Sequence, residues 1–218
     1  MMPPREEVNL SVAGVVPFSS VDWPGILCAV IFCRGCPWRC RYCHNSHLRP
    51  FETALGVESW TWEKSKQLLR SRTGFLEGVV FSGGEATAQP CLTEAIRETR
   101  AMGYRIGLHT SGAYPDRLAV LLPLIDWVGL DIKAPLDQRY DLITGVPGSA
   151  YQTRSSLDAV LRSGVDYQLR TTVHSKLQSP SDLEDLYAQL AQIGSRPTVI
   201  QSFRAQGCRD QELIDAAA

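Results

Sequence analysis

The sequence predicts an α/β fold, and two observations support this expectation. Six segments rich in aliphatic and β-branched residues recur along the 218 residues, and a segment of helical period follows each one, directly or after a loop. Such alternation favours parallel strands joined by right-handed crossovers, with both faces of the sheet covered. Six repeats fall short of the eight in a closed (β/α)8 barrel, so the pattern permits either an open doubly wound sheet or an incomplete barrel.

The expected strands, in chain order, cover residues 26–32, 78–81, 105–108, 127–132, 167–173 and 198–203. Apolar residues at helical spacing mark helices before the third, fifth and sixth strands: Leu92, Ile96 and Met102; Leu157, Val160 and Leu161; and Leu183, Leu186, Leu190 and Ile193. Gly103 and Gly164 can end the first two helices. Ser179 supplies an N-cap to the third helix, with Pro180 in its first turn and Asp182 at its third position.

The composition is that of an ordinary globular protein. Apolar residues make up 44% and charged residues 21% of the chain, which argues against intrinsic disorder, collagen and coiled coil. The net charge of -1 offers no general basic field, so nucleic acid is not an expected partner. No apolar run reaches the roughly 18 residues of a membrane span, and residues 1–7 contain acids and prolines where a signal peptide is apolar. We therefore expect no membrane partner, a cytoplasmic location and one domain over residues 1–218.

Polar residues gather just after each expected strand. In chain order they are the cysteine-rich segment 33–43, Ser82-Gly83-Gly84-Glu85, His109-Thr110-Ser111-Gly112, Asp131 with Lys133, Arg170 with His174, and Gln201 with Arg204. The carboxyl ends of parallel strands form one face in α/β folds, and this face carries the active site. Contact with solvent can make any single strand end polar, but six together indicate one shared pocket.

Four of the seven cysteines, at positions 33, 36, 40 and 43, crowd into one short segment. This spacing is too tight for an ordinary disulfide framework, so reduced thiols that bind a metal are the better interpretation. Thiolates are soft ligands that select iron-sulfur clusters, zinc or copper(I). Cys36, Cys40 and Cys43 on one short loop can hold three corners of a cubane, which leaves the fourth iron open to chelate a substrate.

Cys33 leaves an alternative open. Counted with it, the segment reads C-x2-C-x3-C-x2-C, and a four-thiolate site is arithmetically possible, with zinc as the second candidate metal. Zinc ribbons separate their two pairs by about 15 to 20 residues, and the ferredoxin pattern is C-x2-C-x2-C, so neither spacing matches. Because Cys33 ends an apolar strand, where a buried thiol is ordinary, we expect it to lie outside the site.

The segment between Trp23 and Phe51 contains no Asp or Glu. Its basic residues are Arg34, Arg39, Arg41, His44, His47 and Arg49. Cations beside a cluster ligated by thiolates would raise its potential. A solvated basic loop, or a docking patch for an acidic partner, gives the same pattern, and the sequence does not choose among the three.

Two motifs resemble those of the radical S-adenosylmethionine (SAM) superfamily. Cys36, Cys40 and Cys43, with Tyr42 before the last, match the C-x3-C-x-aromatic-C loop of that superfamily. Gly83-Gly84-Glu85 matches its second motif at the end of the second expected strand. Either motif alone is suggestive, and the pair on successive strand ends is specific.

This resemblance implies an incomplete (β/α)6 barrel of the radical SAM type. The barrel core is expected over residues 26–204, with an N-terminal segment over 1–25 and a C-terminal tail over 205–218. Ala86 departs from the family pattern, which often has proline after the second motif. Proline would only stiffen that turn, so we expect function to survive the change.

Further segments resemble the glycyl-radical enzyme activases within that superfamily. Residues 18–25 look like the activase segment before the first strand, and His44 and Asn45 continue the cysteine loop as in activases. The likeness is closest to the activating proteins of anaerobic (class III) ribonucleoside-triphosphate reductase, in segments 32–38, 108–112, 126–133 and 170–174. It runs from about residue 15 to 208. Residues 48–77 contain no cysteine, so the auxiliary cluster of larger activases is not expected.

The resemblance implies an enzyme with a 4Fe-4S cluster on Cys36, Cys40 and Cys43 that binds SAM at the open iron. One electron would cleave SAM, and the resulting 5′-deoxyadenosyl radical would take a hydrogen atom from a glycine of a glycyl-radical enzyme. The expected partners are anaerobic ribonucleotide reductase and an electron donor such as flavodoxin or ferredoxin. Two alternatives stay open, namely activation of another glycyl-radical protein and a non-enzymatic four-Cys metal-binding module.

The resemblance also implies which side chains contact SAM. Gly83 and Gly84 would let the backbone approach the ligand closely, and Glu85 could accept a hydrogen bond from the ammonium group of SAM. The planar guanidinium of Arg170 suits the SAM carboxylate. The remaining expected contacts are Tyr42 near adenine, and His109 and Thr110 where some activases bind a monovalent cation. Asp131 and Lys133 are also expected at the site. Lys133 ends an apolar strand, where an amine should be paired or functional, and Asp131 is its simplest partner.

Overall fold

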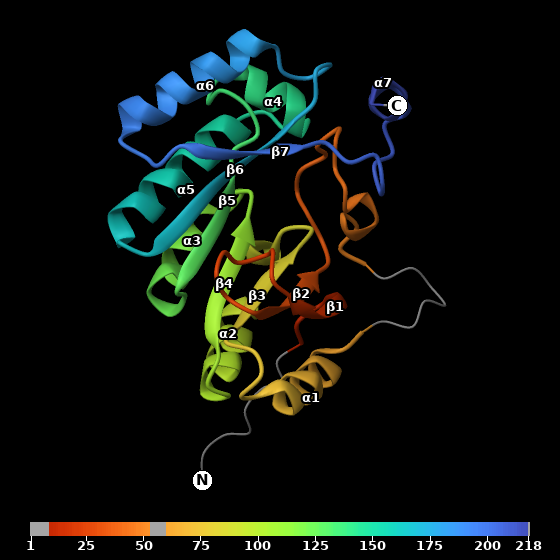
Figure 1. Ribbon diagram of the computed structural model, residues 1–218, viewed down its shortest axis with the longest axis vertical. Helices are drawn as coiled ribbons and strands as arrows, with labels where there is room; N and C mark the ends of the chain where they lie inside the picture. Colours follow the sequence, from red (N-terminus) through yellow and green to blue (C-terminus); the bar gives the residue numbers. More distant parts are fainter. Residues whose placement is uncertain (1–8, 53–59, 218) are drawn as a thin grey trace.

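The computed structural model describes residues 9–52 and 60–217 and contains one seven-stranded sheet whose strands lie in chain order (Figure 1). The strands are β1 (Val12–Ser19), β2 (Cys28–Cys33), β3 (Gly78–Gly83), β4 (Arg105–Thr110), β5 (Trp127–Asp131), β6 (Asp166–Val173) and β7 (Thr198–Ser202). β1 pairs antiparallel with β2, and every later pair is parallel. Within the described residues β1 and β7 do not pair with each other, so the barrel is not closed.

Helices connect the strands in the alternation that the sequence predicts. The α-helices are α1 (Trp62–Arg72), α2 (Leu92–Ala101), α3 (Pro115–Leu121), α4 (Gln138–Thr144), α5 (Ser149–Ser163), α6 (Pro180–Ile193) and α7 (Gln211–Ala216). Short 3-10 turns are η1 (Ser46–Leu48), η2 (Ala86–Ala88) and η3 (Leu122–Leu124). The three helices predicted individually are confirmed as α2, α5 and α6. Ser179 and Asp182 form the capping box of α6, and Gly164 ends α5 in the left-handed conformation.

All six predicted strands are present, each within two residues at either end. The seventh strand, β1, was not predicted; it lies within residues 1–25, which were expected to form an N-terminal segment before the barrel. In β1, Val16 is 39% exposed and Phe18 is 58% exposed, and Pro17 has no N–H to give to a ladder. The pairing of β1 with β2 is interrupted twice, between Val12 and Gly14 and between Val16 and Ser19. An irregular edge strand of this kind leaves a weak sequence pattern.

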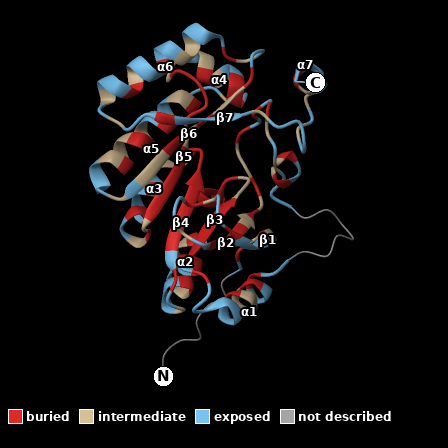
Figure 2. Cartoon of the chain, viewed as in Figure 1, coloured by how far each residue is buried: buried red, intermediate tan, exposed pale blue. Residues whose placement is uncertain are grey.

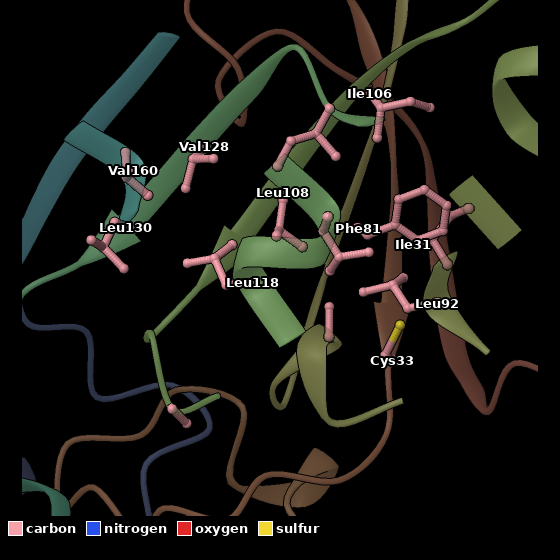
Figure 3. Packing of buried hydrophobic residues seen from close by; sticks show 14 of the residues in the cluster. Ile31, Cys33, Phe81, Leu92, Ile106, Leu108, Leu118, Val128, Leu130 and Val160 are labelled. Carbon is pink, nitrogen blue, oxygen red and sulfur yellow. The ribbon is translucent and has the colours of Figure 1, made fainter. Parts of the chain in front are cut away.

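The main core lies between the sheet and the helices α2, α3 and α5, which cover one face of it (Figures 1 and 2). Side chains alternate across a strand, so every second residue of β2 to β5 points into this core. Figure 3 shows Ile31, Phe81 and Leu108 from the strands beside Leu92 and Leu118 from the helices. Burial of this apolar surface is the main stabilising contribution to the fold.

The opposite face of the sheet, which we call the inner face, holds a smaller apolar group at the amino ends of the strands. Trp23, from the connection between β1 and β2, stacks on Trp127 with ring centroids 5.6 Å apart and planes 18° apart. A Cβ at Gly78 or Gly107 would press on the Trp23 ring, so glycine at these positions makes room for it. Trp23 therefore fills the inner face at the amino ends of the strands, and polar side chains occupy it at their carboxyl ends.

None of the helices in the described part of the chain has the length and apolar character that spanning a bilayer requires.

Candidate active site

The cysteine loop, residues 34–45, leaves the carboxyl end of β2 and is fixed on two sides. On one side the N–H of Cys36 donates to the carbonyl of Arg49 at 3.0 Å. On the other side the N–H of Arg39 donates to the carbonyl of Thr144, at the end of α4, at 2.8 Å. Backbone hydrogen bonds therefore position the loop without a contribution from the thiols.

The thiols of Cys36, Cys40 and Cys43 are reduced and lie near the Lys133 ammonium. Burial and the nearby Glu85 carboxylate raise the pKa of Cys36 to about 12. Burial also raises the pKa of Cys40 and of Cys43, and the positive charge of Lys133 opposes the increase at both. Metal ligation requires thiolates, so a fixed cation next to these sulfurs favours the ligating form.

The donor set fits a cluster better than a single ion. Among the described residues, no group of three or more His, Cys, Asp or Glu side chains is arranged to hold one metal ion. A cubane instead takes each thiolate on a different iron, so its three ligands need not converge on one point. Three soft thiolates on one loop, with a cation beside them, are therefore suited to three corners of an iron-sulfur cluster.

Cys33 lies apart from the loop thiols. It is fully buried at the end of β2 and belongs to the main core, on the helix-covered side of the sheet, close to Leu92 (Figure 3). The location agrees with the expectation of a buried thiol outside the site. A four-thiolate arrangement would require this side chain to leave the core.

The Gly83-Gly84 turn brings the end of β3 against the cysteine loop. The N–H of Gly84 donates to the carbonyl of Cys33 at 2.9 Å, and the N–H of Glu85 donates to the carbonyl of Gly35 at 2.8 Å. A Cβ at Gly83 would collide with the Cys33 backbone, and one at Gly84 would collide with the Gly35 backbone. Gly83 also has a φ of +122°, which favours glycine. Close packing against the cysteine loop therefore requires glycine at both positions.

Glu85 is 1% exposed and its carboxylate is surrounded by protein donors. Its oxygens accept from the Thr87 hydroxyl at 2.6 Å, the Thr110 hydroxyl at 2.7 Å and the Ser111 N–H at 2.8 Å, and from the Thr87 N–H and Ser111 hydroxyl. A carboxylate has about four lone-pair sites, so these hydrogen bonds fill the capacity of Glu85 to accept. Glu85 therefore ties the end of β3 to the end of β4, and Thr110, expected near a cation, is one of its partners.

Asp131, Arg170 and His109 lie in a row on the inner face. Arg170 donates through Nε and Nη2 to Oδ1 of Asp131, at 2.9 and 2.8 Å, and its Nη1 lies 3.0 Å from Nε2 of His109. Burial opposes the charge on Asp131, but Arg170 and then Lys133 outweigh it, and the pKa of Asp131 is lowered. Burial, followed by the positive charge of Arg170, lowers the pKa of His109 to about 3.

The neutral His109 ring can satisfy both of its other neighbours. Nε2 lies 2.7 Å from the carbonyl of Asp22, and Nδ1 lies 3.3 Å from the hydroxyl of Ser82. If Nε2 donates to the carbonyl, Nδ1 accepts from the hydroxyl. In that tautomer Arg170 finds no acceptor on His109, so its Nη1 keeps a hydrogen-bond donor for another group.

Lys133 joins the cysteine loop to this row. Its Nζ lies 3.6 Å from Oδ2 of Asp131 and 5.7 Å from the centroid of the Tyr42 ring, and all but a small part of it is buried. Burial works against the charge of Lys133, but the negative charges around it, that of the Asp131 carboxylate among them, outweigh burial and raise its pKa well above the usual value. Asp131 and Lys133 thus form the ion pair that was expected, and the Lys133 ammonium also lies over the Tyr42 ring.

Three residues of the site were not singled out by the sequence analysis. They are Asp22, whose carbonyl faces His109, Ser82, whose hydroxyl faces the same ring, and Ser111, which binds Glu85. Ser82 and Ser111 lie in the polar segments noted after the strands, and Asp22 lies in segment 18–25. The sequence therefore indicated the segments that contain these residues. It did not indicate their hydrogen-bond partners, which come from strands distant in sequence.

The arrangement can bind a zwitterion. Arg170 and Lys133 offer positive charge to a carboxylate, and Asp131 offers negative charge to an ammonium group, on one partly exposed patch of the inner face. The cysteine loop lies next to this patch through Tyr42 and Lys133. A methionine-like ligand could thus reach both the thiol loop and the charged row.

Comparison with known families decides the classification. The sequence model of the radical SAM superfamily matches residues 30–190. The chain belongs to the radical SAM superfamily. Members use a 4Fe-4S cluster and SAM, so this radical SAM enzyme has the cofactors that the cysteine spacing and the resemblance predicted.

Similar proteins place the enzyme among the glycyl-radical enzyme activases. It is 34% identical over 177 residues to the pyruvate formate-lyase-activating enzyme of Clostridium pasteurianum, covering 79% of this chain and 71% of that protein. It is 28% identical over 208 residues to a protein of Methanocaldococcus jannaschii provisionally named as a glycyl-radical enzyme activating enzyme, covering 93% and 83% of the two chains. Activases act on glycyl-radical enzymes, so the kind of partner agrees with expectation.

A solved structure supports the fold. The crystal structure of SuiB of Streptococcus suis, bound to the precursor peptide SuiA, matches with a TM-score of 0.63 at 13% identity. The match covers 80% of this activase but only 39% of the longer SuiB chain. At this identity the likeness concerns the fold, and it agrees with an open sheet of the radical SAM type.

Proposed function

We propose that this activase cleaves SAM reductively and generates a glycyl radical on anaerobic ribonucleoside-triphosphate reductase. The observation that carries the proposal is a loop with three thiols, fixed by its backbone beside a row of opposite charges on the inner face. The choice of reductase as partner is supported by the likeness of segments 108–112, 126–133 and 170–174 to the activating proteins of that enzyme.

The chain's own residues would hold and orient the reactants. When bound, the cluster supplies the electron that cleaves the sulfonium of SAM, and SAM supplies the radical that removes hydrogen from the partner's glycine. Cys36, Cys40 and Cys43 would hold the cluster. Arg170 would donate its free N–H to the SAM carboxylate, and Asp131 would accept from the ammonium group.

The remaining proposed contacts are secondary to these. Tyr42 would pack near adenine, and Lys133 would balance the charge of the thiolates. Gly83, Gly84 and Glu85 would keep the cysteine loop at the correct distance from the strand ends, and His109 and Thr110 would line the side of the ligand.

We further propose that the reductant is a flavodoxin or a ferredoxin and that residues 1–218 act as one domain. A one-electron carrier is required because the reaction consumes one electron per SAM cleaved. A cytoplasmic location suits seven reduced cysteines, which an oxidising compartment would not preserve.

The experiment that tests the function uses protein reconstituted with iron and sulfide without oxygen. With SAM and dithionite it should release 5′-deoxyadenosine, and Cys40→Ala should abolish the release. Cys91→Ala, which removes a thiol outside the loop, is the matched control and should remain active. Release by the Cys40 variant at the wild-type rate would refute the proposal.

Activation of a different glycyl-radical protein is the second candidate function, because the Clostridium relative is named for pyruvate formate-lyase. Electron paramagnetic resonance separates the candidates. The protein is incubated with SAM, reductant and either the reductase or pyruvate formate-lyase. A glycyl doublet on the reductase alone supports the first candidate, and a doublet on pyruvate formate-lyase alone supports the second.

A non-enzymatic four-Cys module is disfavoured by the burial of Cys33 in the main core. It predicts stoichiometric zinc and a Cys33→Ala variant that loses the metal. We expect iron in its place and a Cys33→Ala variant that still assembles the cluster.

A further inference from the structure

We propose that the surface of the cysteine loop is the docking site of an acidic one-electron carrier protein. This inference rests on the proposed function, because only a redox reaction needs such a partner. The surface, called here the basic collar, consists of Arg39, His44, His47 and Arg49 on or beside the loop and Arg209 from the C-terminal tail.

The C-terminal tail lies directly on the cysteine loop, which brings Arg209 to it. The hydroxyl of Ser46 donates to the carbonyl of Gly207 at 2.7 Å. The thiol of Cys208 lies 3.4 Å from the carbonyl of Arg41, and Arg41 donates to the Asp210 carboxylate at 2.7 Å. Arg209 stands between these two anchored residues, so it shares one surface with the loop.

The arginines of the collar have no carboxylate partner in the described part of the chain. Arg41 is neutralised by Asp210 and Glu212, but Arg39, Arg49 and Arg209 form no ion pair there. Away from the loop, arginines commonly have one, as the pairs at Arg100, Arg139, Arg154 and Arg196 show. Arg39 and Arg209 are also exposed. Unpaired surface charge of one sign attracts a partner of the opposite sign.

The collar also lies beside the cysteines of the loop. Arg39 lies between Cys36 and Cys40 in the loop, and the Arg49 carbonyl accepts from the N–H of Cys36 at 3.0 Å. Cys36 itself is partly exposed. A carrier seated on the collar would therefore bring its redox group close to the metal-binding loop.

An apolar centre within this charged surface is typical of transient interfaces. The Phe51 ring is 54% exposed and lies over Gly35, the residue before Cys36, so closely that a Cβ on Gly35 would collide with it. Encounters between redox partners bury little area, and charge steering supplies most of their specificity. In the transfer the carrier loses one electron and the holoenzyme gains it, with no bond formed or broken.

The test compares a His47→Glu/Arg209→Glu double variant, at two exposed collar residues outside the cysteine loop, with wild-type holoenzyme. Arg162→Glu is the matched control, because Arg162 is an exposed arginine in the last turn of α5, at the opposite end of the strands, and forms no ion pair within residues 9–52 and 60–217. The first measurement is the dissociation constant for an acidic flavodoxin at low ionic strength. The double variant should bind about tenfold more weakly, and the control should stay within about twofold of wild type. Added salt should weaken wild-type binding and remove the difference.

The second measurement is the rate of 5′-deoxyadenosine release with two reductants. With photoreduced flavodoxin the double variant should fall about tenfold, whereas with dithionite, which needs no docking, it should match wild type. Equal flavodoxin binding by the double variant and wild type would overturn the inference, and so would an equal loss with dithionite. Failure of wild type to react with dithionite would instead refute the proposed function, and the binding measurement would still decide the docking site.

Discussion

His109 shows how one buried side chain links the site to the stability of the fold. Its pKa is lowered to about 3 by burial and by Arg170, whereas an unfolded histidine has a pKa of about 6.5. The unfolded chain therefore binds a proton below pH 6.5 that the folded protein does not bind. This contribution to stability is complete above pH 6.5 and is lost as the pH falls towards 3.

We predict that His109→Gln flattens the pH dependence of stability. Between pH 7.5 and pH 5 the wild-type protein should lose about 2 kcal/mol from this group, and the variant should not show that part of the loss. Urea unfolding at both pH values measures it. His47→Gln, at an exposed histidine, is the control and should keep the wild-type slope. An unchanged slope in His109→Gln would contradict the neutral buried ring.

Glu85 is predicted to matter for stability, since it accepts five hydrogen bonds inside the protein. Glu85→Ala leaves the buried donors of Thr110 and Ser111 without partners, which should lower the free energy of unfolding by about 3 kcal/mol. Glu94→Ala, on the exposed side of α2, should change it by less than about 0.5 kcal/mol. If Glu85→Ala unfolds like wild type but loses SAM affinity, Glu85 is a ligand contact as the sequence suggested.

For single residues, the sequence predicted where the site residues lie better than it predicted which residues they contact. The three loop cysteines, Lys133 with Asp131, and Arg170 all lie near one another, because strand ends in a parallel sheet share one face. The bonds of Glu85 to Thr110 and Ser111 could not be predicted, since these partners come from the end of a different strand. The glycines of the second motif pack against the backbones of Cys33 and Gly35, which are also distant in sequence.

At the scale of the elements, α7 is fastened to the cysteine loop by few contacts. Arg41 donates to Asp210 and to Glu212, at 2.7 and 2.9 Å, from a side chain that is 40% exposed. Leu213 of α7 is buried, and its carbonyl lies 3.0 Å from Nε2 of His174. The helix is thus anchored by one apolar side chain and by ion pairs that salt can screen.

We predict that Arg41→Ala loosens α7 without unfolding the sheet. Amide exchange over residues 211–216 should become about fivefold faster, while exchange in β3 to β5 stays unchanged. Arg154→Ala, which removes an ion pair with Asp158 inside α5, is the control and should leave α7 unaffected. At high salt, the amide exchange rate of the wild-type protein over residues 211–216 should approach that of the variant. No acceleration in the variant would show that Leu213 alone holds the helix.

The elements were predictable where the sequence pattern was strong. β2 to β7 are buried or regular enough to give apolar runs, and α6 begins with the capping box, as expected. β1 could not be recognised, because it is an edge strand with Pro17, two irregularities and exposed apolar residues. Its pairing depends on β2, which no local pattern reports.

At the scale of the whole molecule, side-chain packing and backbone hydrogen bonds join the metal-binding loop to the core. Trp38 of the loop is 1% exposed and packs edge-on against Tyr140 of α4, with centroids 6.0 Å apart. Backbone bonds from Cys36 and Arg39 hold the loop from both sides. In small zinc modules, by contrast, the metal supplies most of the folding energy, and its removal unfolds the chain.

We therefore predict that removing the cluster with a chelator lowers stability but keeps the fold. Holoenzyme should unfold about 10 °C higher than stripped protein, because a ligand that binds only the native state stabilises it by mass action. The far-UV circular dichroism of the stripped protein should match that of holoenzyme, and faster amide exchange should be confined to residues 34–45. Trp38→Ala should remove the remaining anchor, so that in stripped protein it costs about 3 to 5 kcal/mol and extends the exchange into α4. Loss of the far-UV signal on chelation alone would mean that the cluster, and not Trp38 with the loop backbone, fixes the cysteine loop to the sheet.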